Sequence, residues 1–224
     1  ATHSAWVAET VRQLVYAQYG AETYTRGLNV TTTVKATQQE AAYRSLRKGI
    51  MDYERRQIYR GPEQFVDLPA DRKDLDDAVD EALSDHPDNG DVMAAVVLEA
   101  NPKRILAVRG NGEPFEIVGE GLRPAQSGLS DKAPPKIKIR PGAVIRVVRT
   151  PKHTWEITQL PEVEGAFIAL NPKDGSIQAM VGGFDFHKNK FNHVTQAWRQ
   201  PASDFKPFIT SAVQEKGFSP PPLF

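Results

Sequence analysis

Five short runs rich in apolar and β-branched residues follow one another between residues 92 and 160. They read VMAAVVLEA, RILAVRG, PFEIV, KIKIRPGAVIRVVRT and TWEITQL. Turn-forming residues punctuate this region, at Asn101-Pro102, Gly110-Asn111-Gly112, Pro134-Pro135, Pro141-Gly142 and Pro151-Lys152. Short strands with turns at this spacing predict a small antiparallel β-barrel or sandwich.

The beginning of the chain has a different periodicity. Val7, Val11 and Leu14 recur at helical spacing, which predicts a helix over residues 4–19. GLNVTTTV at 27–34 is rich in β-branched residues and is predicted to form a strand.

A second helix is predicted to follow that strand. Thr37-Gln-Gln-Glu40 fits a capping box, in which two side chains satisfy free N–H groups at a helix start. This helix is expected to run to about residue 57, with one apolar face made of Tyr43, Leu46, Ile50 and Tyr53. The chain then becomes acidic: residues 63–99 carry 12 Asp and Glu against 2 Lys and Arg, and include the helix-like stretch DRKDLDDAVDEALSDH.

A second β unit follows the barrel region. AFIALNP (166–172) and SIQAMVGG (176–183) flank Lys173-Asp174-Gly175. Two such runs around an Asp-Gly turn predict a β-hairpin. The polar stretch DFHKNKFNHVTQAW then leads to RQPASDFKPF.

The composition excludes several kinds of site. The 224 residues include no cysteine, so disulfides, zinc-thiolate sites and cysteine nucleophiles are ruled out. Lys+Arg and Asp+Glu both number 28, so no global charge attracts nucleic acid or anionic membranes. No run of about 18 apolar residues suggests a membrane span, and the N-terminus lacks the pattern of a signal peptide. Any membrane contact is therefore expected through a segment outside this chain.

Ser203 and Lys206 are the candidate catalytic pair. Pro201 favours a break before them, and Phe208, Ile209 and the residues after them fit a helix, so the serine is predicted to lie at a helix N-terminus. A serine hydroxyl needs a neighbouring base to act as a nucleophile, and a lysine can be that base if its pKa is lowered. By itself an S-x-x-K string is common, and an N-cap serine with a solvated lysine is by far the preferred explanation of it.

The surrounding sequence resembles the class A, bifunctional penicillin-binding proteins, in particular the 1A type of Gram-negative bacteria. GLNVTTTVKATQQEAAYRSL is similar to the first strand and helix of their transpeptidase domain, and GAFIALNPKDGSIQAMVGGFDF to the next two strands. FNHVTQAWRQPASDFKPF resembles the loop and helix that carry the nucleophile. The 1A type also inserts an oligonucleotide/oligosaccharide-binding (OB)-like barrel, which matches the change of sequence character at 61–164.

This resemblance implies that Ser203 is the acyl-accepting nucleophile and Lys206 the residue that handles its proton. The substrates would be peptidoglycan stem peptides ending in D-Ala-D-Ala, and β-lactams would acylate the same serine. The backbone N–H of Ser203 would supply half of the oxyanion hole. The parent would be a transpeptidase and glycosyltransferase on the periplasmic side of the bacterial inner membrane, with a regulatory lipoprotein as a possible partner at the inserted domain. The resemblance implies no cofactor.

The chain also departs from the family. The family commonly has Gly-Ser-Ser where this chain has Ala202-Ser203-Asp204, and Asp204 could stabilise a charged Lys206 and so make it a worse base. The family's S-x-N and K-T-G motifs occur nowhere in the 224 residues. We therefore expect the isolated chain to be inactive, and the sequence identifies no substrate-binding residues.

Other motifs predict little. The five histidines (3, 86, 153, 187 and 193) show no metal-ligand spacing. The run from Asp85 to Asp91 hints at a calcium loop, but Pro87 occupies a ligand position and Val96 replaces the bidentate glutamate, so a solvated turn is the preferred interpretation. The Gly-x-Gly pairs at 110 and 119 lack the rest of a dinucleotide motif.

Two alternatives to an enzyme fragment remain. Residues 103–152 carry 11 Lys and Arg against 4 Asp and Glu, including KIKIR at 136–140, which would suit a barrel that binds single-stranded nucleic acid. Such barrels stack bases on aromatic side chains, and this stretch holds only Phe115, so basic residues on the wet face of a strand explain it better. The other alternative is a non-catalytic OB-like module that docks a regulatory protein or glycan.

Together these observations predict an α+β fold with three parts. Residues 1–60 would be a linker with the first strand and helix of a transpeptidase domain. Residues 61–164 would be an inserted OB-like antiparallel barrel with an acidic helical segment. Residues 165–224 would be the transpeptidase hairpin and the helix of the S-x-x-K motif, truncated. No metal site and no nucleic-acid partner are expected.

Overall fold

The computed structural model describes residues 3–110, 112–187, 190–198, 203 and 206–216. Its helices are α1 (Ala5–Tyr19), α2 (Ala36–Glu54), α3 (Arg72–Asp85), α4 (Gln126–Leu129) and α5 (Lys206–Glu215), with 3-10 helices η1 (Gly20–Tyr24) and η2 (Gly119–Ala125). Its strands are β1 (Gln64–Phe65), β2 (Met93–Asn101), β3 (Arg104–Val108), β4 (Phe115–Val118), β5 (Ala143–Arg149), β6 (Trp155–Thr158), β7 (Phe167–Leu170) and β8 (Ile177–Val181). The predicted α+β class is confirmed.

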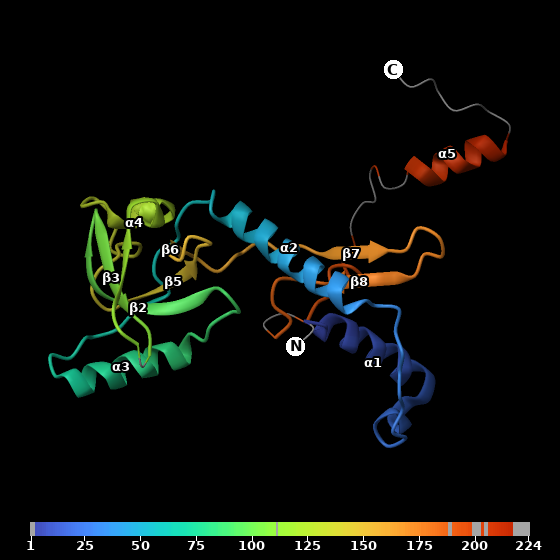
Figure 1. The fold of residues 1–224 in the computed structure, drawn as a ribbon, viewed down its shortest axis with the longest axis horizontal. Helices are drawn as coiled ribbons and strands as arrows, with labels where there is room; N and C mark the ends of the chain where they lie inside the picture. Colours follow the sequence, from blue (N-terminus) through green and yellow to red (C-terminus); the bar gives the residue numbers. More distant parts are fainter. Residues whose placement is uncertain (1–2, 111, 188–189, 199–202, 204–205, 217–224) are drawn as a thin grey trace.

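Strands β1 to β6 form one antiparallel sheet in the order β1-β5-β2-β3-β4, with β6 also paired to β5 (Figure 1). Both β1 and β6 bond to β5, β1 at its first residues and β6 at its last. No ladder joins β4 to β6 in the described part of the chain, but Phe115 of β4 stacks on Trp155 of β6 with 4.3 Å between ring centroids. The two ends of the sheet are thus brought together by side chains.

This sheet has its own apolar core. Its largest buried apolar side chains come from β3, β4, η2, α4, β5 and β6: Ile105, Ile117, Leu122, Leu129, Ile145 and Ile157. The acidic helix predicted at 71–86 is α3, and Asp71 caps it by accepting hydrogen bonds from the backbone N–H groups of Lys73 and Asp74. Its apolar side, Val79 and Ala82, packs against β2 and β5, so its carboxylates can face water.

Strands β7 and β8 form the predicted hairpin, which is confirmed. Gly175 adopts a φ of +71° in the turn, a left-handed conformation that favours glycine, and its N–H donates to the carbonyl of Asn171. Helices α1 and α2 pack on the hairpin through a buried cluster of Trp6, Ala42, Ala179 and Val181. In Figure 1, α2 runs between the hairpin and the six-stranded sheet.

A buried glutamine on α2 fixes the helix to the hairpin. The Gln39 side chain is fully buried, and its amide both donates to the carbonyl of Met180 and accepts from the N–H of Met180, at 2.8 Å each. The side chain therefore bonds to β8 as a neighbouring strand would. A buried amide with both groups satisfied is stable, whereas either group left alone would be costly.

The glycine pair at the end of β8 is explained by close packing. A Cβ on Gly182 would lie 2.3 Å from Asn192 Oδ1 and 2.9 Å from the indole of Trp6. A Cβ on Gly183 would meet the same indole at 3.0 Å. The pair lets α1 and the segment around Asn192 approach the end of the hairpin.

The predicted strand at 27–34 is wrong. The segment forms no strand, and Leu28 and Val30 are exposed. Only its end touches the hairpin, where Thr33 Oγ1 donates to the carbonyl of Ile177. β-branched residues favour a strand only when a partner strand covers them, and none does so here.

The predicted capping box is also wrong. Helix α2 begins at Ala36, one residue before Thr37, because the backbone N–H of Lys35 bonds to the carbonyl of Gln178 on β8 and fixes the start. Glu40 instead accepts from Arg44 and lies 2.6 Å from His3. The helix ends at Glu54 rather than at about 57, and Tyr53 of its predicted apolar face is partly exposed.

KIKIR at 136–140 is not part of a strand. The N–H groups of Ile137 and Lys138 both bond to the carbonyl of Pro134, so the Pro134-Pro135 pair starts a turn. Ile139 is buried, and the Arg140 guanidinium lies 3.7 Å from the centre of the Phe65 ring. The interpretation of these basic residues as the wet face of a strand is therefore wrong.

Candidate functional site

Ser203 and Lys206 lie at the beginning of α5. Lys206 is the first residue of this helix, and Ser203 occupies a 3-10 position three residues earlier. Pro207 is the second helical residue, where a missing N–H breaks no helical hydrogen bond. Both candidate residues are exposed, and so are Phe208 and Ile209 after them. Ala202 and Asp204 lie outside the described residues.

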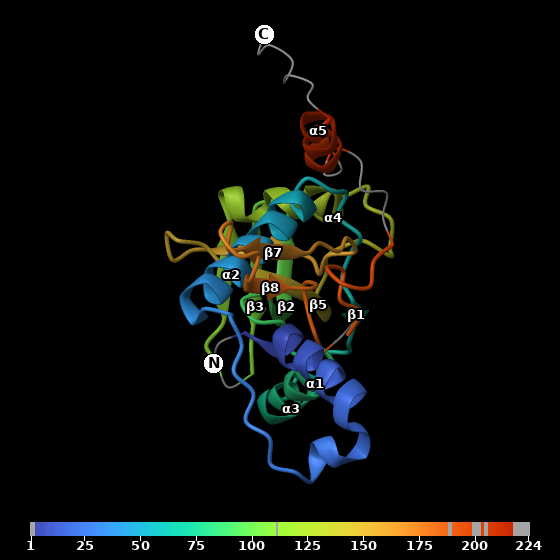
Figure 2. The same cartoon turned by 90° about the vertical axis from the view of Figure 1, so that its right-hand side faces the viewer.

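Helix α5 stands apart from both sheets in the two views (Figures 1 and 2). The arrangement therefore presents a hydroxyl and an amine at a helix N-terminus, where the helix dipole favours developing negative charge. Within the residues that the structure describes, none of the helices combines the length and the apolar character needed to cross a membrane.

Two residues between β8 and Ser203, Asn192 and His193, are anchored by polar contacts. Asn192 is buried, and its Nδ2 donates to Thr10 Oγ1 on α1. The backbone N–H of His193 donates to the carbonyl of Gly182, and its Nδ1 lies 2.7 Å from the same oxygen. These contacts fix where the segment leaves the hairpin, and the sequence pattern did not indicate them.

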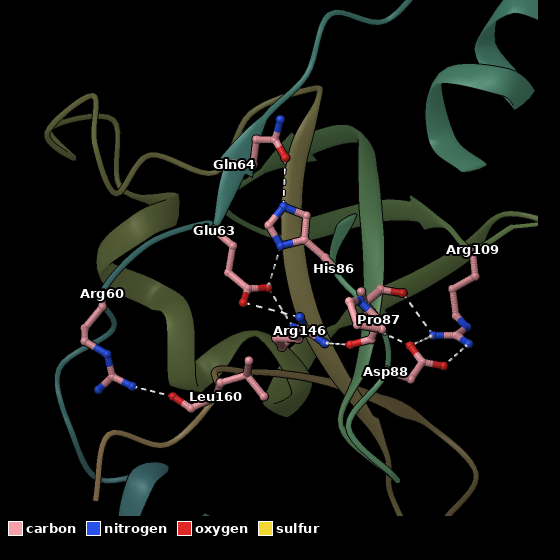
Figure 3. Close-up of polar contacts among 10 residues, drawn as sticks. Arg60, Glu63, Gln64, His86, Pro87, Asp88, Arg109, Arg146 and Leu160 are labelled. Carbon is pink, nitrogen blue, oxygen red and sulfur yellow. Dashed lines mark hydrogen bonds and ion pairs between the residues drawn. The ribbon is translucent and has the colours of Figure 1, made fainter. Parts of the chain in front are cut away.

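A network of charged side chains joins the start of β1, where the chain enters the six-stranded sheet, to the turn before β2 (Figure 3). Arg146 of β5 is buried, and its Nε donates to Glu63 Oε2 at 2.6 Å while its Nη1 donates to the carbonyl of Pro87. His86 Nε2 lies 2.7 Å from Gln64 Oε1. A buried arginine of this kind is stable only while its acceptors stay in place.

The same turn holds an ion pair between Asp88 and Arg109. Two Arg109 nitrogens donate to the Asp88 carboxylate at 3.0 and 2.7 Å. The Arg109 guanidinium lowers the pKa of Asp88 below its ordinary value, despite the opposing effect of burial. Asp85–Asp91 is largely exposed, as predicted for a solvated turn, but its polar groups bind three arginines: Arg47 of α2, Arg146 of β5 and Arg109, the residue after β3.

The two segments that connect the six-stranded sheet to the rest of the chain bond to each other. Arg60 donates to the carbonyl of Leu160 at 2.6 Å, and its backbone N–H donates to Gln159 Oε1 at 2.9 Å. The Arg60 guanidinium also pairs with the buried carboxylate of Glu54 at the end of α2. A cavity of about 960 Å³ lies between α2 and the β5–β6 turn.

Two residues that line this cavity form an ion pair. Arg55, directly after α2, donates to Glu156 of β6 at 2.8 Å. Burial raises the pKa of Glu156, while the Arg55 charge opposes the rise. Histidine and carboxylate side chains form no cluster of three or more suited to a metal ion anywhere in the described part of the chain.

Comparison with protein families gives two matches that together follow most of the chain. Residues 59–163 match the penicillin-binding protein OB-like domain. Residues 165–222 match the penicillin-binding protein transpeptidase domain.

Comparison with individual proteins agrees. The chain is 40% identical to penicillin-binding protein 1A of Neisseria lactamica over 215 residues, which cover 96% of this chain and 27% of that protein. It is 34% identical to penicillin-binding protein 1A of Escherichia coli strain K12, covering 96% of this chain and 26% of that protein. The chain thus spans about a quarter of the length of these relatives.

The fold is similar to a solved structure as well. The crystal structure of penicillin-binding protein 1A from Haemophilus influenzae superposes with a TM-score of 0.79 and 28% identity, over 96% of this chain and 31% of that one. The matches to two domains of one family, in their expected order, agree with this similarity in sequence and in fold. The chain therefore belongs to the class A penicillin-binding proteins and is a fragment of the 1A type.

Proposed function

We propose that the longer protein containing this chain cross-links peptidoglycan stem peptides through Ser203. The observation that carries the proposal is the transpeptidase match over 165–222, a stretch in which Ser203 and Lys206 stand at the start of α5. The same match supports β-lactams as compounds that react with this serine. The comparisons favour this function over a barrel that binds single-stranded nucleic acid and over a non-catalytic OB-like module that docks a regulatory protein or glycan.

The chemistry proposed for the pair is acyl transfer. Ser203 Oγ attacks the carbonyl of the penultimate D-Ala, and Lys206 takes the proton of the hydroxyl as the new C–O bond forms. The bond to the terminal D-Ala then breaks, and that D-Ala leaves as an amine that has gained a proton. An amine of a second stem peptide displaces Ser203 and completes the cross-link. The Ser203 backbone N–H would hold the oxyanion of each tetrahedral intermediate.

We propose that the chain divides into three parts: residues 1–60 and 165–224 from the transpeptidase domain, and 61–164 as the inserted OB-like domain. The separate core of β1–β6 supports this division, as does the bonding between the two connecting segments. Because S-x-N and K-T-G are not among the 224 residues, these pieces alone lack the groups that would bind the substrate carboxylate and complete the proton relay.

For the longer protein we propose a glycosyltransferase activity in addition, and a position on the periplasmic side of the inner membrane. A regulatory lipoprotein would dock on the inserted domain. These proposals rest on the names of the relatives and on the resemblance of the sequence, since the chain spans only about a quarter of those relatives.

The test is acylation by a fluorescent penicillin, read by intact mass on the 224-residue chain and on the longer parent protein. We expect an adduct on the parent that disappears in Ser203→Ala and forms much more slowly in Lys206→Ala. Ser211→Ala is a matched control, because Ser211 is an exposed serine on α5, the helix that begins at Lys206. An adduct that persists in Ser203→Ala would refute the proposed nucleophile. An adduct on the 224-residue chain would refute its expected inactivity.

A further inference from the structure

Arg47 of α2 is a buried side chain whose hydrogen-bonding groups are all used. Its side chain is only 6% exposed. Nη2 donates to the Asn89 carbonyl at 2.7 Å and to Asp91 Oδ1 at 2.9 Å, and Nε donates to the same Asp91 oxygen at 3.3 Å. Nη1 donates to Asn89 Oδ1 at 3.0 Å and to the Phe184 carbonyl at 3.2 Å. The five N–H donors of a guanidinium are thus all satisfied.

These acceptors belong to two regions of the molecule. Asn89 and Asp91 lie in the turn between α3 and β2, which belongs to the six-stranded sheet. Phe184 follows the hairpin directly after Gly183, and its ring lies 4.1 Å from the Arg47 guanidinium. One side chain therefore bonds the inserted sheet and the hairpin at the same time.

A second hydrogen bond joins the same two regions without involving Arg47. Asn89 Nδ2 donates to Asp185 Oδ2 at 2.9 Å. Asp185 Oδ1 in turn accepts from the backbone N–H of His187 at 3.0 Å. The turn before β2 therefore also holds the first residues of the segment that continues towards Ser203.

The position of this contact along the chain relates it to the nucleophile. Phe184 is the first buried residue after the Gly182-Gly183 pair, and the segment it begins is next fixed at Asn192 and His193 by α1 and β8. A shift of the turn Asn89–Asp91 would move Phe184 relative to those later anchors. A planar guanidinium bound in this way transmits such a shift better than a lysine, which has one charged centre and no fixed geometry.

We propose that Arg47 is a positioning residue that couples the turn Asn89–Asp91 of the inserted sheet to Phe184–His187, the first residues after the hairpin on the way to Ser203, so that a change at this turn alters the acylation rate of Ser203. The effect on acylation rests on the proposed function. The structural dependence of Phe184 and the residues after it on the Asn89–Asp91 turn is independent of that function.

The turn itself offers a matched pair of variants. Asp91→Ala removes the carboxylate that Arg47 binds, and Asp91 is 72% exposed, so the variant should fold. Asp88→Ala removes a carboxylate three residues away that bonds Arg109 and the N–H of Ala94, all within the inserted sheet. Asp88→Ala removes three hydrogen bonds, one more than the two that Asp91→Ala removes, but leaves the contacts of Arg47 intact.

The measurement is the acylation of the longer parent protein by penicillin, separated into the affinity for penicillin and the rate of the chemical step. We expect Asp91→Ala to slow the chemical step by roughly 2- to 30-fold, a range typical of coupling through a packed contact, with little change in affinity. Asp88→Ala should leave the rate unchanged, and Arg47→Lys should slow it as Asp91→Ala does. An unchanged rate in Asp91→Ala, or equal slowing in Asp88→Ala, would overturn the coupling.

Amide hydrogen exchange on the 224-residue chain gives a readout independent of activity. We expect faster exchange at the N–H groups of Phe184 and His187 in Asp91→Ala, and exchange as in the unmodified chain in Asp88→Ala. If the parent protein forms no adduct at Ser203, the proposed function fails, and this exchange measurement alone decides the coupling. Equal exchange at Phe184 and His187 in both variants would then overturn it.

Discussion

The six-stranded sheet and the hairpin differ in how far this chain buries them. Strand β2 has four consecutive buried residues, Ala94–Val97, whereas none of the residues of β7 is buried. The hairpin leaves Phe167, Ile168 and Leu170 exposed, beside an apolar groove of about 430 Å³ between α2 and β7. The sheet is covered by its own strands and helices, whereas half of the hairpin has no cover among the described residues.

The six-stranded sheet is stabilised by a core built from its own residues. The hairpin is packed against the rest of the chain on one side only. The buried side of the hairpin, β8, is held by α1 and α2 through Trp6 and Gln39. Its exposed side, β7, has apolar side chains that the described residues do not cover. Four predictions test this comparison, beginning with the largest expected effect.

Core truncation should separate the two regions most strongly. Ile117→Ala, at a fully buried site in β4, should lower the free energy of unfolding of the six-stranded sheet by about 2 to 5 kcal/mol, because it leaves a cavity. Leu170→Ala in β7, at a site 54% exposed, should change stability by less than about 0.5 kcal/mol. Urea unfolding followed by amide exchange of each region measures both. Similar losses in the two variants would contradict the comparison.

Removal of Gln39 should weaken the hairpin alone. Gln39→Leu leaves the N–H and carbonyl of Met180 buried without partners, which should cost the α2–hairpin contact about 1 to 3 kcal/mol. Amide exchange should therefore accelerate at Met180 and stay unchanged at Ile145 of the six-stranded sheet. Gln13→Leu on the exposed side of α1 is the control. An equal effect of this variant would contradict a stabilising role of the Gln39–Met180 hydrogen bonds.

Acid should affect the six-stranded sheet through Asp88. The hydrogen bonds from the Arg109 guanidinium lower the pKa of Asp88 from its ordinary value of 3.8, so the ionised form is favoured in the folded state. The resulting stability is present above pH 3.8 and is lost as the pH falls from there through the lowered pKa. Asp88→Asn should therefore be less stable than the unmodified chain at pH 7, with the difference shrinking below pH 3.8. Thermal melting across this range measures it, and a constant difference would argue against the ion pair.

The smallest effect on stability is expected at Trp198. This side chain is 100% exposed, whereas Trp6 is buried and Trp155 is stacked on Phe115. Trp198→Ser should change the free energy of unfolding by less than about 0.5 kcal/mol. It should nevertheless remove most of the tryptophan fluorescence that iodide quenches in the unmodified chain. Unchanged quenching would mean that Trp198 is covered.

Sequence patterns were most successful where a structure depends on neighbouring residues. The hairpin around Asp174-Gly175 and the helices at 5–19 and 72–85 formed as predicted, because turn chemistry and helical periodicity act over a few residues. The candidate site was predicted only as a pair of residues. The side chains that hold the surrounding segment, such as Arg47 and Asn192, carry no local signal that distinguishes them from surface residues.

The failures have a common cause. The strand expected at 27–34 had no neighbour to pair with, and the turn at Pro134-Pro135 took the hydrogen bonds that a strand at 136–140 would have needed. The start of α2 was fixed by β8 through Lys35 rather than by Thr37. In each case the local structure was determined by whether a hydrogen-bond partner was present outside the segment itself.

The sequence by itself determined the α+β class, the family, the hairpin and the S-x-x-K motif, because family resemblance and local propensity both depend on residues that are close together in the sequence. Only the tertiary structure decided which polar groups meet in the interior. Gln39 bonds Met180 across 141 positions of the chain, and Arg47 bonds Phe184 across 137. A buried polar group is stable only with a partner in the right geometry, and which distant residue supplies that partner depends on the packing of the whole chain.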